Sequence, residues 1–181
     1  DTPMALSPVT VLGSHPGTVA LTAWQTRSGT TQALPGYDTG GWLTNSSGPQ
    51  QMGADGDASC YAWYRTMFNA PSAGTYTISI GNAADHMIPF VDGTAVSSGN
   101  VSGSSFTTTL SSGNHAIAVF TSHYGRNKLV GYNGPISQMH VKGLSGAAYC
   151  LGTQVSGPTS LTSWKIMMTN SSAVGETPPA S

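Results

Sequence analysis

Apolar and polar residues alternate along much of this chain with a period of two. In the stretch 75–80, Tyr76, Ile78 and Ile80 are apolar, and the positions between them are Thr or Ser. Successive side chains of a β-strand point to opposite faces of a sheet, so this pattern predicts a strand with one buried face. No helical spacing of apolar residues extends beyond one turn. The chain is therefore expected to consist of strands.

Further strands are predicted by the same alternation or by short β-prone runs. They lie at 9–12, 18–22, 62–69, 87–91, 105–110, 115–121, 136–141 and 161–168. Pro89 predicts an edge strand or a bulge, because proline donates no ladder hydrogen bond. Asp92-Gly93 is typical of a tight turn between strands.

The spacing of these strands indicates the fold class. Strand signals recur about every 8–12 residues, separated by Gly, Pro, Asn or Asp, which is typical of a sandwich or jelly roll. We predict one all-β jelly-roll β-sandwich over residues 1–174, followed by a tail of linker composition at 175–181.

Composition and charge narrow the function classes. A chain of 181 residues suits one domain. Only 7% of its residues are charged, but four Trp, seven Tyr and four Phe argue against a disordered chain. The net charge of −1 supplies no positive surface for nucleic acid. No apolar stretch reaches the ~20 residues of a membrane span. We therefore expect neither a nucleic-acid partner nor a membrane span.

Cys60 and Cys150 are the only cysteines. They are either two unrelated buried thiols or the two halves of one disulfide, and we expect the disulfide. In the chain-entropy account, closing a loop of this length stabilises the fold by about 4–5 kcal/mol.

A series of short motifs follows a definite order along the chain. The motifs are Leu34-Pro35-Gly36-Tyr37-Asp38, Trp42, Trp63-Tyr64-Arg65-Thr66 with Phe68, Phe90-Val91-Asp92-Gly93, the stretch 113–119, Tyr124-Gly125-Arg126-Asn127, Gly134-Pro135-Ile136 and Leu161-Thr162-Ser163-Trp164-Lys165. This order resembles the galactose-binding-like jelly-roll domain of family 35 β-galactosidases and, more loosely, the sugar-binding domain of family 2 enzymes. Asp92 stands where the family usually has Asn. In that family the domain lies beside a catalytic barrel, which needs about 250 residues and is not present here.

Residues for hydrolysis or metal binding are sparse. Glycoside hydrolysis uses two carboxylates, and the mid-chain Asp residues are first interpreted as turn residues. The stretch 143–147 misses the Gly-x-Ser-x-Gly nucleophile motif by its last residue. None of the five histidines has metal-ligand spacing. Asp55 and Asp57 are candidates for a structural calcium ion, and no other cofactor is expected.

Carbohydrate binding needs aromatic faces for the apolar side of a sugar and planar polar groups for its hydroxyls. Trp63 and Trp164 are expected in the core. The candidates for sugar contact lie in loop-like segments or at strand ends: Trp42, Tyr61, Asp85, His86, His123, Tyr124, Arg126 and Asn127. For the loop at 124–127, the alternative that its own hydrogen bonds merely hold it together stays open.

We therefore expect a non-catalytic carbohydrate-binding or accessory module, secreted or at the cell surface, associated with a β-galactosidase-like glycoside hydrolase. Its partners would be a carbohydrate, such as a galactoside-type glycan, and other domains of a parent protein. One alternative is a structural or docking domain of a larger surface, viral or enzyme assembly, and another is a small stand-alone hydrolase. The resemblance does not identify the sugar, because one fold hosts many functions.

Overall fold

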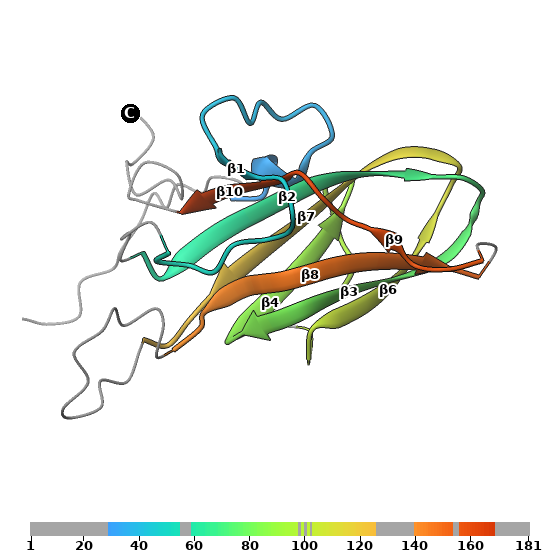
Figure 1. Ribbon diagram of the computed structural model, residues 1–181. Helices are drawn as coiled ribbons and strands as arrows, with labels where there is room; N and C mark the ends of the chain where they lie inside the picture. The colour runs from blue at the N-terminus through green and yellow to red at the C-terminus, as the bar shows by residue number, and fades with distance from the viewer. Residues whose placement is uncertain are drawn as a thin grey trace, which may run out of the picture.

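The computed structural model describes residues 29–54, 59–97, 99, 101, 103–125, 140–153 and 156–168. The strands predicted at 9–12 and 18–22, most of the strand at 136–141 and the tail at 175–181 lie outside these residues. The described segments form two antiparallel sheets that face each other (Figure 1). The predicted all-β sandwich is confirmed.

The larger sheet has the strand order β1-β10-β2-β7-β4-β5, and the smaller sheet has the order β6-β3-β8-β9. The strands of the larger sheet are β1 (Leu43–Asn45), β2 (Tyr61–Ala70), β4 (His86–Val91), β5 (Thr94–Ala95), β7 (Gly113–Ser122) and β10 (Trp164–Met168). Those of the smaller sheet are β3 (Gly74–Ala84), β6 (Ser105–Leu110), β8 (Gly143–Gly152) and β9 (Thr159–Ser160). A short 3-10 helix, η1 (Thr31–Ala33), precedes β1.

The main core lies between the sheets and uses alternate residues of each strand. Tyr64, Ile117 and Trp164 of the larger sheet are fully buried there, with Tyr76 and Ile78 of the smaller sheet. A ten-residue strand such as β2 can supply this face because every second residue points inward. The apolar residues of the stretch 75–80 therefore form the inner face of β3.

A second apolar cluster lies on the outer face of the larger sheet. Trp63, Phe90 and Ala118 pack there against Ala33 and Trp42 of residues 29–42, the described segment before β1, which we call the attached segment. Figure 1 shows this segment, in blue, over β2 and β7 on the side away from the smaller sheet. Trp63 and Trp164 are thus both buried, as expected, but on opposite faces of one sheet.

Arg65 attaches this segment to the sheet. Its guanidinium, in a side chain only 4% exposed, donates to the carbonyls of Gln32 (3.1 Å), Leu34 (2.6 Å) and Pro35 (2.7 Å). Burial lowers the pKa of Arg65, and the charge of Asp92 partly offsets that effect. A buried charge needs such partners, so Arg65 has an architectural role.

The turn after β4 follows the prediction, but β4 is neither an edge strand nor bulged at Pro89, because it lies between β7 and β5 in continuous register. Asp92 and Gly93 both have positive φ, at 49° and 85°, and join β4 to β5 as the tight turn that was predicted. The carbonyl of Pro89 accepts the Val96 amide, on the side away from β7. Among the described strands, only the two-residue β5 pairs with β4 on that side, and this pairing begins at Phe90, so the missing amide of Pro89 interrupts no ladder bond.

The predicted disulfide is absent, because both thiols are free. Cys60 is exposed just before β2 of the larger sheet, whereas Cys150 is buried in β8 of the smaller sheet. The side chain of Cys150 belongs to the core between the sheets, and burial raises its pKa to about 11. Among the described residues, no helix is long and apolar enough to cross a bilayer.

Candidate functional site

One end of the larger sheet collects several of the predicted site residues on its outer face. In the ladder, Tyr61 at the start of β2 pairs with Ser122 at the end of β7, which pairs with His86 at the start of β4. Antiparallel pairing places the start of one strand beside the end of its neighbour. Predicted strand ends that are distant in the sequence therefore meet in one row.

The next row is apolar and supports the first. Trp63, Phe120 and Ile88 pair across the same three strands. The Tyr61 ring stacks on the Phe120 ring, with centroids 5.9 Å apart and an interplanar angle of 15°. Phe120 in turn contacts Trp63 at 5.2 Å. Tyr61 remains 46% exposed, so nearly half of its surface is open to solvent.

An apolar hollow of about 250 Å³ lies beside these rings. Its walls are Gly29, Thr30, Trp63, Ile88, Phe90 and Phe120. The hollow extends the aromatic surface from Tyr61 toward the attached segment. A flat apolar ligand face can therefore rest on Tyr61 while a small apolar group enters beyond Phe120.

Tyr124 and His86 add a polar clasp to this surface. The Tyr124 hydroxyl and His86 Nε2 form a hydrogen bond, and the two rings meet edge to face at 4.7 Å. Tyr124 is 83% exposed. We call Tyr61, His86, Phe120, Ser122 and Tyr124 together the aromatic rim.

Asp85 holds the clasp in place. Its carboxylate accepts the Tyr124 amide at 2.9 Å and both its oxygens accept Lys142 Nζ, at 2.7 and 2.8 Å. Burial raises the pKa of Asp85, but the hydrogen bonds from Lys142 and Tyr124, with the charges of Lys142 and His123, outweigh it, so the pKa is lowered. Asp85 is thus an ionised positioning residue whose oxygens are already occupied.

His123 is a buried residue that connects the chain before β2 with the chain after β7. It is 9% exposed, its Nε2 donates to the Ser59 carbonyl at 3.2 Å, and its Nδ1 accepts the Gly125 amide at 2.9 Å. Its main-chain amide also donates to the Cys60 carbonyl. The ring therefore fastens the chain before β2 to the chain after β7, and it leaves little surface for a ligand.

The other predicted site residues lie elsewhere or are not described. Trp42 is 9% exposed and packs against Tyr37 within the outer apolar cluster, so its ring offers little area for stacking. The remaining four fall outside the described residues: Arg126, Asn127, Asp55 and Asp57. Across the described part of the chain, no three His, Cys, Asp or Glu side chains gather as metal ligands do.

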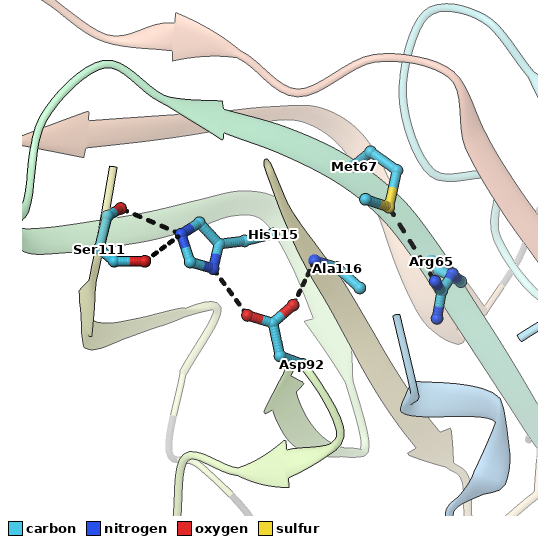
Figure 2. Close-up of polar contacts among 6 residues, drawn as sticks. All are labelled: Arg65, Met67, Asp92, Ser111, His115 and Ala116. Atoms are coloured by element: carbon cyan, nitrogen blue, oxygen red, sulfur yellow. Dashed lines mark hydrogen bonds and ion pairs between the residues drawn. The ribbon is translucent and has the colours of Figure 1, made fainter. Parts of the chain in front are cut away.

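A second polar cluster lies at the opposite end of β4 and β7 and has the residue types of a hydrolytic triad (Figure 2). His115 Nδ1 lies 2.7 Å from Asp92 Oδ2, and the other oxygen of Asp92 accepts the Ala116 amide at 2.8 Å. His115 Nε2 lies 3.0 Å from the Ser111 carbonyl and 3.4 Å from its hydroxyl. A carbonyl only accepts, so Nε2 carries a proton in this geometry and cannot act as the base for Ser111.

The cluster of Asp92, Ser111 and His115 therefore links two turns, and we call it the clamp. Asp92 belongs to the β4–β5 turn, and Ser111 precedes β7. A hollow of about 370 Å³ adjoins the clamp, but no Phe, Tyr or Trp lines it. A further hollow of about 340 Å³ between Arg65, Thr162 and Lys165 also lacks these rings. Of these surfaces, only the aromatic rim combines an exposed ring with polar groups.

Three residues of this region were not predicted: Phe120 and Ser122 of the aromatic rim, and Lys142, which binds Asp85. Phe120 lies within the strand predicted at 115–121 and Ser122 one position beyond it, so the alternation of β7 already places both on one face of the strand. Lys142 is 57 positions from Asp85, and nothing in the local pattern connects them. The sequence distinguishes Lys142 only as one of the six Lys and Arg residues of the chain.

Comparison with known proteins gives no family for this chain, since neither a family model nor a curated protein matches it.

Proposed function

We propose that the chain is a non-catalytic carbohydrate-binding module of the galactose-binding-like jelly-roll type, secreted or at the cell surface, which accompanies a β-galactosidase-like enzyme. The proposed sugar site is the aromatic rim. The observation that carries the proposal is the 46% exposure of Tyr61, whose ring stacks on Phe120 and whose strand lies one strand away from His86 and its hydrogen bond with Tyr124.

The rim has the two features that sugar binding uses. A pyranose has an apolar C–H face that rests on an aromatic ring, and hydroxyls at its edge that need polar partners. Tyr61 supplies the ring, and the hydroxyls of Tyr124 and Ser122 and the imidazole of His86 supply hydrogen-bonding groups beside it. Such a shallow site suits weak binding, with Kd values of roughly millimolar to micromolar.

The size of the stacking contribution follows from the exposure of Tyr61. A tyrosine contributes roughly 200 Å² of surface. At 46% exposure about 100 Å² is open, and a sugar on one face covers about half of it. At ~25 cal/mol per Å² this contact contributes about 1.3 kcal/mol, or roughly a tenfold change in Kd.

The experiment measures retention on an immobilised galactoside for the wild-type chain, Tyr61→Ala and Tyr149→Ala. Tyr149 is the matched control because it is 42% exposed but lies on β8 of the other sheet. We expect Tyr61→Ala to weaken binding about tenfold and Tyr149→Ala to leave it unchanged. Equal effects of the two substitutions would show that the aromatic rim is not the sugar site. No retention of the wild type on any galactoside resin would contradict the proposal in favour of a structural docking domain.

A second variant separates stacking from hydroxyl recognition. Tyr124→Phe keeps the ring and removes the hydroxyl that bonds His86. If that hydroxyl also contacts the sugar, binding weakens by about 1 kcal/mol, roughly fivefold, while unfolding stays unchanged within about 0.5 kcal/mol. Unchanged affinity assigns recognition to stacking and the other polar groups alone.

A further inference from the structure

The two sheets end in edge strands of very different length. In the larger sheet the edges are β1, with three residues, and β5, with two. In the smaller sheet one edge is β9, with two residues, and the other is β6, with six (Figure 1). Among the described strands, β6 is thus the longest edge strand. The shorter edge strands offer little backbone for pairing with another chain.

The outer side of β6 carries backbone groups with no partner in the described part of the chain. The Ile80 amide donates to the Ser104 carbonyl at 2.8 Å, and the register from Ser79↔Ser105 to Gly74↔Leu110 is continuous. Backbone groups alternate between the two sides of a strand, so those of Ser105, Thr107 and Thr109 point away from β3. Their N–H and C=O groups form an open ladder.

β6 also lacks the features that usually protect an edge from pairing. Proteins protect edges with lysine or other charges, proline or a bulge. The sequence of β6, SFTTTL, contains no charge and no proline, and its pairing with β3 has no bulge. Two identical edges of this kind meet without like-charge repulsion, and the whole chain carries a net charge of only −1.

We infer that β6 pairs with β6 of a second copy of the chain, in antiparallel register about a two-fold axis at Thr107. Ser105 of each copy then lies opposite Thr109 of the other, and every outward backbone group of these residues gains a partner. The Thr77–Thr107 hydroxyl contact of 3.1 Å lies on the same sheet face, so the row of threonines continues across the axis.

A second copy fits this edge better than an unrelated strand. Pairing about a two-fold axis needs an edge that is complementary to itself, and an uncharged run of hydroxyl-bearing, β-branched residues meets that condition. The smaller sheets of the two copies would form one continuous sheet. The aromatic rim lies on the outer face of the other sheet, so the dimer would carry two of them.

The test is sedimentation equilibrium of the full chain from micromolar to millimolar concentration. We expect the mass to rise from 18.5 kDa toward twice that value. Thr107→Lys places two ammonium groups together at the axis and should weaken association at least tenfold. Thr75→Lys adds the same charge at an exposed position of β3 and should leave association unchanged. A wild-type mass of 18.5 kDa throughout, or equal weakening by both variants, overturns the inference.

Amide hydrogen exchange gives a readout that does not depend on a substitution. The amides of Ser105, Thr107 and Thr109 should exchange more slowly as concentration rises, while that of Thr108, whose backbone faces β3, should not change. Exchange at all three amides that is independent of concentration overturns the inference, whether it is fast or slow.

Discussion

Arg65 determines how firmly the segment before β1 is held against the larger sheet. Its guanidinium is 4% exposed and donates to the carbonyls of Gln32, Leu34 and Pro35. Arg65→Met keeps the length of the side chain and removes all three hydrogen bonds. Hydrogen bonds to charged groups contribute ~1.5–3 kcal/mol each, and removal of the buried charge returns several kcal/mol of desolvation cost. The expected net loss in unfolding free energy is about 3 kcal/mol.

Thermal unfolding followed by circular dichroism measures this loss. For a chain of this size each kcal/mol lowers Tm by ~2–4 °C, so Arg65→Met should melt about 6–12 °C below the wild type. Lys165→Met is the matched control, because Lys165 is the cross-strand partner of Arg65 and its exposed hydrogen bond goes only to Thr44. The control should change Tm by less than about 2 °C. If the two variants melt together, the carbonyl contacts of Arg65 do not hold the segment.

Three further predictions concern the rest of the fold. The lowered pKa of Asp85 means that its stabilisation is present above the unfolded value of ~3.9 and is lost as pH falls through the folded pKa. Urea unfolding of Asp85→Asn should therefore show a deficit at pH 7 that shrinks toward pH 3; a constant deficit would refute the ion pair. A thiol reagent should label exposed Cys60 rapidly and buried Cys150 only after unfolding. If neither cysteine is labelled in the unfolded, unreduced chain, the two cysteines form a disulfide after all. In urea unfolding, Asp92→Ala should lower the unfolding free energy by about 2–3 kcal/mol and Ser111→Ala by less than about 0.5 kcal/mol, because His115 bonds the Ser111 carbonyl, which the alanine variant keeps. Comparable losses for the two variants would show that His115 bonds the Ser111 hydroxyl instead.

Most strands of the described sandwich were predictable because their alternation is strict. The strand predicted at 105–110 coincides with β6, and the one predicted at 62–69 lies within β2. The tryptophans at 63 and 164 were correctly assigned to the core. Alternation within a strand does not say which face of the sheet a segment outside the strand covers. The burial of Trp42, which lies in the attached segment and packs on the outer face, therefore had no local signal.

β8 was missed because its glycines resemble turn signals. In the structure they are positions of close packing: a Cβ on Gly152 would lie 2.4 Å from the Tyr76 ring. On Gly143, whose φ is +71°, a Cβ would lie 2.5 Å from the Tyr64 hydroxyl. Both tyrosines come from other strands, so the reason for these glycines is tertiary.

The candidate site was predictable in its residue types and not in its register. Asp85, His86 and His123 were expected at strand ends and Tyr124 in the loop that follows, and antiparallel pairing brings these segments together. Which of them would face solvent depends on a one-residue shift, because that shift moves every side chain to the other face. The sequence therefore could not separate the exposed Tyr124 from the buried His123.

Chemical-shift mapping tests the proposed sugar site most directly. A galactoside is titrated into the isotope-labelled chain while the backbone amide signals are followed. The account predicts progressive shifts at Tyr61, Ser122 and Tyr124, with the signals of Ser111 and His115 at the far end unmoved. Shifts confined to that far end, or no shifts at millimolar sugar, would contradict it.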